Sequence, residues 1–183
     1  MKVRSDSDRP GDVRLEAAPA PDGPTLSFIG RVHSAHADTS TAPKSPAMAR
    51  ERGGAATLVI DPPYRPGLVG LAADSHVIVL GWLHQVPRDI IQITRPALSA
   101  PSVARRVEDA PPAPSQPAPT GVFALRSPVR PNPISLSVAR ILSVDVAAGQ
   151  IAIDAIDLID GTPIVDIKPY RPGVDAVPDA VVP

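Results

Sequence analysis

The sequence predicts an all-β domain made of short antiparallel strands. Apolar and β-branched residues gather in short runs, proline and glycine separate these runs, and no stretch keeps a helical period of apolar residues. The chain has no internal repeat and no alternation of strands with helices, so a parallel sheet is not expected. On these residues alone, the strands fit either an antiparallel barrel or a sandwich.

Eight segments are predicted to be strands. Their apolar residues alternate with polar ones, as in 151–158, or form a continuous run, as in 76–84, which we expect to be a central strand. Proline ends several of the segments because it cannot donate to a strand ladder. The predicted strands are residues 25–32, 56–60, 76–84, 89–94, 121–126, 134–146, 151–158 and 164–167.

The remaining segments are predicted to be loops and tails. Residues 33–54 form a polar loop, and a single helical turn is expected within 67–74. A long loop of Ala, Pro and Ser spans 97–120, and loops of that length are usually functional or disordered. We expect a disordered tail at 1–23, one domain at 24–173 and a C-terminal tail at 174–183.

Composition limits the classes of function. The 183 residues suffice for one domain with a real core, and the formal net charge of −1 provides no global positive field for nucleic acid. Cysteine is absent, which excludes disulfides and cysteine metal sites and suits a cytoplasmic protein. No apolar run approaches the roughly 20 residues of a membrane span, and the first residues lack the apolar centre of a signal peptide.

Three prolines stiffen a polar loop at 126–133. Pro128, Pro131 and Pro133 fix the backbone around Arg126, Arg130 and Asn132. Guanidinium groups pair with carboxylates or phosphates, and an asparagine amide can pair with an adenine edge. The alternative is that both arginines are solvated or pair with nearby aspartates. The residues alone do not decide between these two interpretations.

A second polar turn reads Asp160-Gly161-Thr162-Pro163. Asp-Gly is the strongest short signal for a hairpin turn, which is a purely structural interpretation. The same turn would present a carboxylate and a hydroxyl to a ligand. Elsewhere, His84 ends an apolar run and is more often structural than catalytic. The four histidines lack the spacing and acidic neighbours of a metal site, so we assign no metal.

The blocks GVFALRSPVRPNPISLS and DLIDGTPIVDIKPYRP resemble the signature of the TrmO family, also called TsaA-like or YaeB-like. The resemblance extends more weakly from about Phe28 to Pro172. It implies a single antiparallel β-barrel with long Pro-rich loops. It also implies a dimer that uses S-adenosylmethionine to methylate threonylcarbamoyl-adenosine beside the tRNA anticodon.

The resemblance also implies where the cofactor binds. It points to Arg126, to the backbone near Leu136, to the Asp160–Pro163 turn and to His84 with Gln85. A further contact falls on a loop in which family members have Pro-Arg-Gln. The implied cofactor residues are Pro43, Lys44, Ser45, His84, Gln85, Arg126, Leu136, Asp160, Gly161, Thr162 and Pro163.

Other roles are assigned to fewer residues. Asp160 and His84 are the two candidates for a catalytic base, and the sequence does not choose between them. Substrate-binding candidates are Arg130, Asn132 and Lys168. Lys44 and Ser45 stand where the family has Arg and Gln, and the 97–120 loop lacks the family's basic character. These departures leave two alternatives open: a methyltransferase for a small molecule, and a non-catalytic barrel that binds S-adenosylmethionine or RNA.

Overall fold

The computed structural model describes residues 11, 13–14, 23, 25–94 and 119–180. By its internal contacts the chain divides into two units. The barrel unit comprises Asp22–His84 and Ile134–Val182, and the small-sheet unit comprises Met1–Pro21, Gln85–Pro133 and Pro183. Among the described residues, no helix has the length and apolar character needed to cross a membrane.

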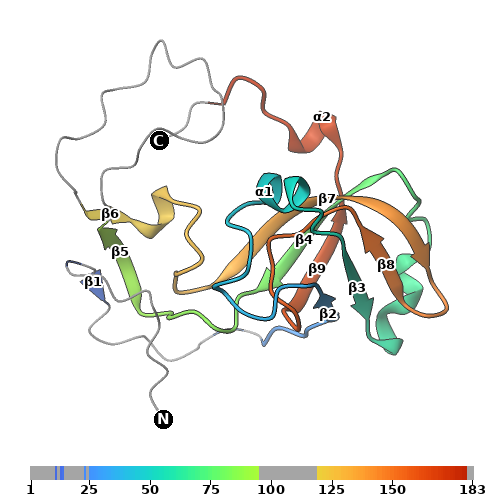
Figure 1. Ribbon diagram of the computed structural model, residues 1–183, viewed down its shortest axis with the longest axis horizontal. Coiled ribbons are helices and arrows are strands. Elements are labelled where there is room, and N and C mark those ends of the chain that lie inside the picture. The colour runs from blue at the N-terminus through green and yellow to red at the C-terminus, as the bar shows by residue number, and fades with distance from the viewer. Residues whose placement is uncertain (1–10, 12, 15–22, 24, 95–118, 181–183) are drawn as a thin grey trace. The chain divides into compact units, whose positions relative to one another are not determined.

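Six antiparallel strands of the barrel unit form one closed sheet. They pair in the order β2-β3-β8-β7-β4-β9, and β9 pairs back with β2. The neighbours β7, β4 and β9 run side by side in Figure 1. The strands are β2 (Gly30–His33), β3 (Ala56–Ile60), β4 (His76–Trp82), β7 (Ile134–Asp145), β8 (Gln150–Ile153) and β9 (Pro163–Pro169).

Alternating side chains fill the interior of this sheet. In β4, Val77 and Val79 are fully buried, whereas Ile78 and Leu80 are only partly buried. The same period of two places Leu58 and Ile60 of β3 inside. The interior is therefore aliphatic, and the aspartates and arginines of these strands lie on the outer face or at the strand ends.

The small-sheet unit has its own three-stranded sheet and core. The strands β1 (Val13–Arg14), β5 (Ile90–Thr94) and β6 (Pro119–Gly121) pair in the order β1-β5-β6. A 3₁₀ turn, η2 (Val122–Ala124), follows β6 directly. Ile90, Ile93, Val122 and Val129 form a separate buried cluster. The all-β class is confirmed, but a single sheet does not account for all the strands.

Three helical segments differ from the expected loops. The predicted polar loop 33–54 contains α1 (Pro46–Glu51), which begins where the Ser45 hydroxyl accepts a hydrogen bond from the Met48 N–H at 3.2 Å. The helical turn expected within 67–74 lies earlier, as η1 (Pro62–Leu68), because proline suits the first turn of a helix. A short α2 (Pro172–Asp175) follows β9.

Several predicted strands are shorter than expected. The strand predicted at 25–32 begins only at Gly30, and the one at 76–84 ends at Trp82. Within 121–126 only Gly121 is in a strand, because η2 takes up the next three residues. Within 151–158 the strand ends at Ile153, because the Asp154 carboxylate accepts hydrogen bonds from the backbone N–H groups of Arg140 and Ala155 at 2.8 and 2.9 Å. The predicted tail 1–23 and loop 97–120 lie mostly outside the described residues, although Val13–Arg14 is a strand.

Candidate functional site

The Asp160-Gly161 dipeptide forms a turn that leads into β9. The Thr162 N–H donates to the Ile159 carbonyl at 3.2 Å, and Gly161 has a φ of +73°, which glycine adopts at no steric cost. The strands on either side, β8 and β9, are not paired with each other. The interpretation of this turn as a simple hairpin between neighbouring strands is therefore wrong.

Backbone hydrogen bonds hold this turn against β2 and the residues after it. The Asp160 N–H donates to the His36 carbonyl at 2.7 Å, and the Gly161 N–H donates to the Val32 carbonyl at 2.8 Å. The fully buried Thr162 donates its hydroxyl to the Ile159 carbonyl at 2.7 Å. Every residue of the turn is thus fixed through the backbone, so the Asp160 side chain projects from a rigid support.

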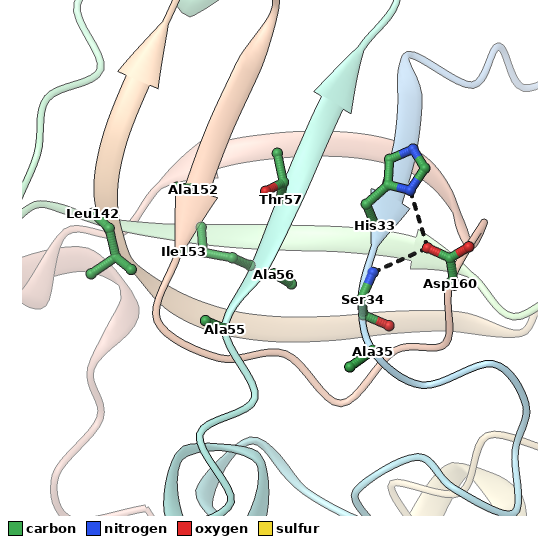
Figure 2. A pocket seen from close by; sticks show the side chains of 10 residues that line it. All are labelled: His33, Ser34, Ala35, Ala55, Ala56, Thr57, Leu142, Ala152, Ile153 and Asp160. Carbon is green, nitrogen blue, oxygen red and sulfur yellow. Dashed lines mark hydrogen bonds and ion pairs between the residues drawn. The ribbon is translucent and has the colours of Figure 1, made fainter.

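One oxygen of the Asp160 carboxylate contacts two nitrogen atoms. Its Oδ1 accepts from the Ser34 N–H at 3.1 Å and lies 3.2 Å from Nδ1 of His33. Figure 2 shows the second oxygen, Oδ2, pointing away from both nitrogen atoms. No described residue hydrogen-bonds to Oδ2, and the side chain is 47% exposed. One oxygen is therefore used for positioning, and the other is available to a ligand.

A hollow of about 380 Å³ lies beside this carboxylate, within the barrel unit. Its walls combine small apolar side chains with a few polar ones, as binding pockets commonly do. No arginine or lysine lines it, so the hollow suits a neutral or cationic group better than a phosphate. The residues drawn in Figure 2 line it: His33, Ser34, Ala35, Ala55, Ala56, Thr57, Leu142, Ala152, Ile153 and Asp160.

The segment Pro43-Lys44-Ser45 immediately precedes α1. Pro43 is buried and Lys44 is exposed. The Ser45 hydroxyl caps the helix. The structure therefore gives Ser45 a local structural role and leaves Lys44 as the residue of this segment whose side chain can reach a ligand.

Three other predicted residues of the barrel unit lie on β7, after β4 and on β9. Leu136 pairs with Leu80 across the two strands, and its side chain is 45% exposed on the outer face. His84 lies two residues beyond the end of β4 and is exposed. Lys168 on β9 donates to Asp166 at 2.8 Å, and this hydrogen bond raises the pKa of Lys168.

The Pro-locked loop 126–133 belongs to the small-sheet unit, together with Gln85. The loop is anchored by Val129, which is buried in the small core, and by the buried Ser127, whose hydroxyl accepts from the Val129 N–H at 3.3 Å. Arg126 and Asn132 are exposed. The sequence-predicted cofactor residues are thus divided between the two units.

Arg130 has a local role within this loop. Its guanidinium donates to the carbonyl oxygens of Leu125 and Ser127 at 3.2 and 3.4 Å. These bonds fold the side chain back onto its own loop, which favours a structural role over substrate contact. The Arg130 guanidinium is therefore neither simply solvated nor paired with an aspartate, which were the two structural alternatives considered from the sequence.

Sequence reasoning missed His33. A lone histidine after an apolar strand gives no signal, and its partner Asp160 is far away along the chain. His36 also bears on the turn, because its carbonyl accepts from Asp160, and its own Nε2 is buried with no hydrogen-bond partner among the described residues. Within those residues, no group of three His, Asp or Glu side chains could hold a metal ion.

Comparisons with known proteins place this chain in a family. The sequence model of the family called tRNA-methyltransferase O N-terminal domain matches residues 31–176. The chain is 33% identical over 155 residues to VirR of Rhizobium radiobacter, a probable S-adenosyl-L-methionine-binding protein, with 85% of this chain and 75% of VirR covered. It is 32% identical over 154 residues to the tRNA (adenine(37)-N6)-methyltransferase of Escherichia coli strain K12, with 83% and 60% covered.

A solved structure gives the same result. The crystal structure of TrmO from Pseudomonas aeruginosa aligns with a TM-score of 0.62 and 33% identity, covering 87% of this chain. This chain spans only 61% of that structure and 60% of the Escherichia coli relative. The match of the family model, together with the identity to VirR, decides the assignment. The chain belongs to the tRNA-methyltransferase O N-terminal domain family.

Proposed function

We propose that this chain binds S-adenosylmethionine and transfers its methyl group to an adenosine derivative in tRNA. The specific acceptor we propose is the exocyclic amine of threonylcarbamoyl-adenosine beside the anticodon. The names of the relatives support the cofactor and the reaction, since one is a tRNA (adenine(37)-N6)-methyltransferase and another an S-adenosyl-L-methionine-binding protein. A tRNA substrate would place the reaction in the cytoplasm.

The observation that carries the proposal is the rigidly held carboxylate of Asp160 beside an open hollow. A carboxylate suits a ligand with a sulfonium charge, an amino group and ribose hydroxyls, because it attracts the first two and accepts hydrogen bonds from the last two. The hollow of about 380 Å³ falls within the usual range of small-molecule sites, roughly 300–1,000 Å³. Among the residues assigned to the cofactor, Asp160 lines this hollow, and its carboxylate fits the charge of S-adenosylmethionine.

The proposed cofactor contacts are given for each unit by itself. In the barrel unit we assign them to the turn Asp160-Gly161-Thr162-Pro163, to His84, to the backbone near Leu136 and to the segment Pro43-Lys44-Ser45. Arg126 and Gln85, the other proposed contacts, belong to the small-sheet unit. Arg126 would pair with a carboxylate, and Lys44 would supply a point charge where a guanidinium fork would be more directional. Thr162 and Ser45 use their hydroxyls in the fold, so their contacts to a ligand would come from the backbone.

Methyl transfer requires mainly that the protein places the two reactants correctly. S-adenosylmethionine supplies the methyl group when bound, and methyl transfer to an amine is a direct displacement that depends on alignment. The residues of this chain would hold the two reactants in line and exclude water. A base is needed only where the attacking amine loses its proton early. Asp160 and His84 are the candidates for the base that would accept that proton.

The proposed tRNA contact depends on local basic groups. Arg50 of α1 bonds Asp154 at 2.9 Å and Arg140 of β7 bonds Asp74 at 3.2 Å, so each already has an acidic partner. Lys44 and Arg52 are exposed on either side of α1 and add positive charge there. In the small-sheet unit we propose that Asn132 contacts the acceptor and that Arg130 supports the loop carrying it. In the barrel unit Lys168 of β9 is the proposed acceptor contact.

We also propose that the chain forms a homodimer through the outer face of β4 and β7. Ile134 and Leu136 are 40% and 45% exposed there, opposite Trp82 and Leu80. Phe28 packs on Trp82 with ring centroids 6.3 Å apart. A second copy would bury this apolar face. Light scattering at tens of micromolar should report a dimer, and Ile134→Lys should shift it to monomer. Val69→Lys, at an exposed residue outside β4 and β7, should not.

Methyl transfer can be measured directly. With labelled S-adenosylmethionine, the chain should methylate threonylcarbamoyl-adenosine tRNA and not the same tRNA lacking that modification. Transfer that ignores the modification would exclude the specific acceptor. No transfer to any tRNA, with cofactor binding intact, would favour the small-molecule methyltransferase or the non-catalytic binding protein.

A further inference from the structure

His33 is the side chain that contacts the proposed ligand-binding carboxylate. Its Nδ1 lies 3.2 Å from Oδ1 of Asp160, and Figure 2 shows the imidazole directed at that oxygen from the end of β2. The side chains of His33 and Asp160 are 63% and 47% exposed. Exposed ion pairs contribute little to folding stability. A role for this contact must therefore be sought in the position and charge of Asp160.

The geometry explains how His33 can orient the carboxylate. The Ser34 N–H and the His33 imidazole both approach Oδ1. The N–H alone leaves the side chain free to turn about its terminal torsion, which is broad in aspartate. A second donor on the same oxygen restricts that rotation, so Oδ2 keeps one direction.

The backbone fixes both partners of this contact. His33 is the last residue of β2 and pairs with Thr57 of β3. The Asp160 turn is bonded to Val32 and His36 on either side of His33. The distance between the imidazole and the carboxylate therefore depends on side-chain torsions and not on loop position.

Few charges surround the pair among the described residues. On β2, Arg31 donates to the Gly161 carbonyl at 3.2 Å, and in the segment after β2, His36 contributes a second imidazole. The neighbouring strands present the uncharged Thr57 and Ala152 to the hollow. Protonation of His33 therefore adds a positive charge beside Asp160 with only Asp160 itself to offset it.

We infer that His33 is a positioning residue for Asp160 and makes binding of the sulfonium cofactor depend on pH. This inference rests on the proposed function. A neutral imidazole with its proton on Nδ1 donates to Oδ1 and leaves the full negative charge for the ligand. A protonated imidazole still donates but offsets that charge. Histidine side chains change charge between about pH 5 and 8. Affinity for a cation should therefore rise as the pH rises through this range.

The test compares S-adenosylmethionine with S-adenosylhomocysteine, which lacks the sulfonium charge, by calorimetry at about pH 5.5 and about pH 8. For the wild type, affinity for S-adenosylmethionine should fall on the order of fivefold at the lower pH, the upper range for an exposed charge pair. Affinity for S-adenosylhomocysteine should fall less. His33→Gln, a neutral donor, should keep the affinity at pH 8 and lose the pH dependence.

Two further variants complete the design. His33→Arg, always charged, should give the lower affinity at both pH values, and His33→Phe should bind weakly at both because the carboxylate is no longer oriented. His76→Gln removes an exposed histidine at the start of β4 and should keep the wild-type profile.

The possible failures are distinguishable. If the wild type binds, Asp160→Asn weakens binding and the His33 variants keep the wild-type profile, the role of His33 is overturned and the cofactor site stands. If the wild type binds neither ligand at either pH, the proposed function and this inference are both overturned.

Discussion

The Arg130 guanidinium donates to the carbonyl oxygens of Leu125 and Ser127, the two residues that flank Arg126. Arg126 can thus be tested separately from the residue that supports it. Arg126→Ala should lower affinity for S-adenosylmethionine about 10- to 100-fold, because a hydrogen bond to a charged group is worth about 1.5–3 kcal/mol. Calorimetry measures this loss of affinity.

Arg130→Ala should act on the loop first. Losing the two carbonyl contacts should speed amide hydrogen exchange at Val129 and lower cofactor affinity less than Arg126→Ala does. Arg88→Ala is a matched control, since Arg88 Nε also donates to a carbonyl of this loop, that of Pro131, at 2.9 Å. Equal and small effects on affinity from Arg126→Ala and Arg130→Ala would remove Arg126 from the cofactor site.

The buried hydroxyl of Thr162 gives a stability prediction for the turn. Thr162→Val keeps the shape but removes the donor to the Ile159 carbonyl, at a cost of about 1–2 kcal/mol. This should lower the melting temperature by about 2–8 °C for a protein of this size. Thr162→Ser retains the hydroxyl and should recover part of the loss. A valine variant as stable as the wild type would show that the hydroxyl does not hold the turn.

A substitution at Gly30 tests the close approach of β2 and β3. A Cβ atom there would lie 2.2 Å from the Val59 carbonyl oxygen, a backbone atom that cannot move away alone. Gly30→Ala should therefore destabilise the protein by at least the roughly 1–3 kcal/mol of an overpacked core. Gly173→Ala is the control, because nothing lies within 4 Å of its Cβ position. Thermal melting should separate the two, and similar melting temperatures would contradict the strand pairing described.

The surroundings of the Asp154 carboxylate should make the stability of the protein depend on pH. Burial raises the pKa of Asp154, but the hydrogen bond from Arg50, the backbone N–H of Arg140 and the Arg50 charge outweigh it, so this pKa lies below the ordinary 3.8. Because the folded-state pKa is depressed, the stabilisation is present above about pH 4 and is lost as the pH falls through the folded-state value.

The thermal melting of the Asp154→Asn variant, compared with that of the wild type at two pH values, tests the direction of this pH dependence. The wild type should be more stable at pH 7 by about 1 kcal/mol, and the difference should shrink at about pH 3. Arg50→Gln should also lower the stability at pH 7, but by less than Asp154→Asn does. A difference that does not change with pH would mean that the charge of Asp154 contributes nothing.

Local patterns predicted most of the strands. The β-branched runs at Ala56–Ile60 and His76–Trp82 became β3 and β4, because a period of two or a continuous apolar run specifies a buried strand directly. The helix α1 was missed inside a polar loop although Ser45-Pro46 is a good helix start. A helix of six residues shows too little period to be recognised.

Long-range pairing could not be predicted. The pairing of β2 with both β3 and β9 depends on tertiary packing, and so does the contact of His33 with Asp160. The resemblance led to Asp160 and its turn, but it did not indicate that Oδ1 is already occupied. Nor did the sequence indicate that Arg130 would bond its own loop, because a proline-rich segment specifies stiffness and not the direction of a side chain.

Thermal unfolding with and without S-adenosylmethionine tests the central claim most directly. A ligand that binds only the folded state at about 100 times its Kd adds about 2.7 kcal/mol. The melting temperature should therefore rise by about 5–10 °C, and by clearly less in Asp160→Asn. No rise at millimolar S-adenosylmethionine or S-adenosylhomocysteine would contradict the assignment of a cofactor site to this chain.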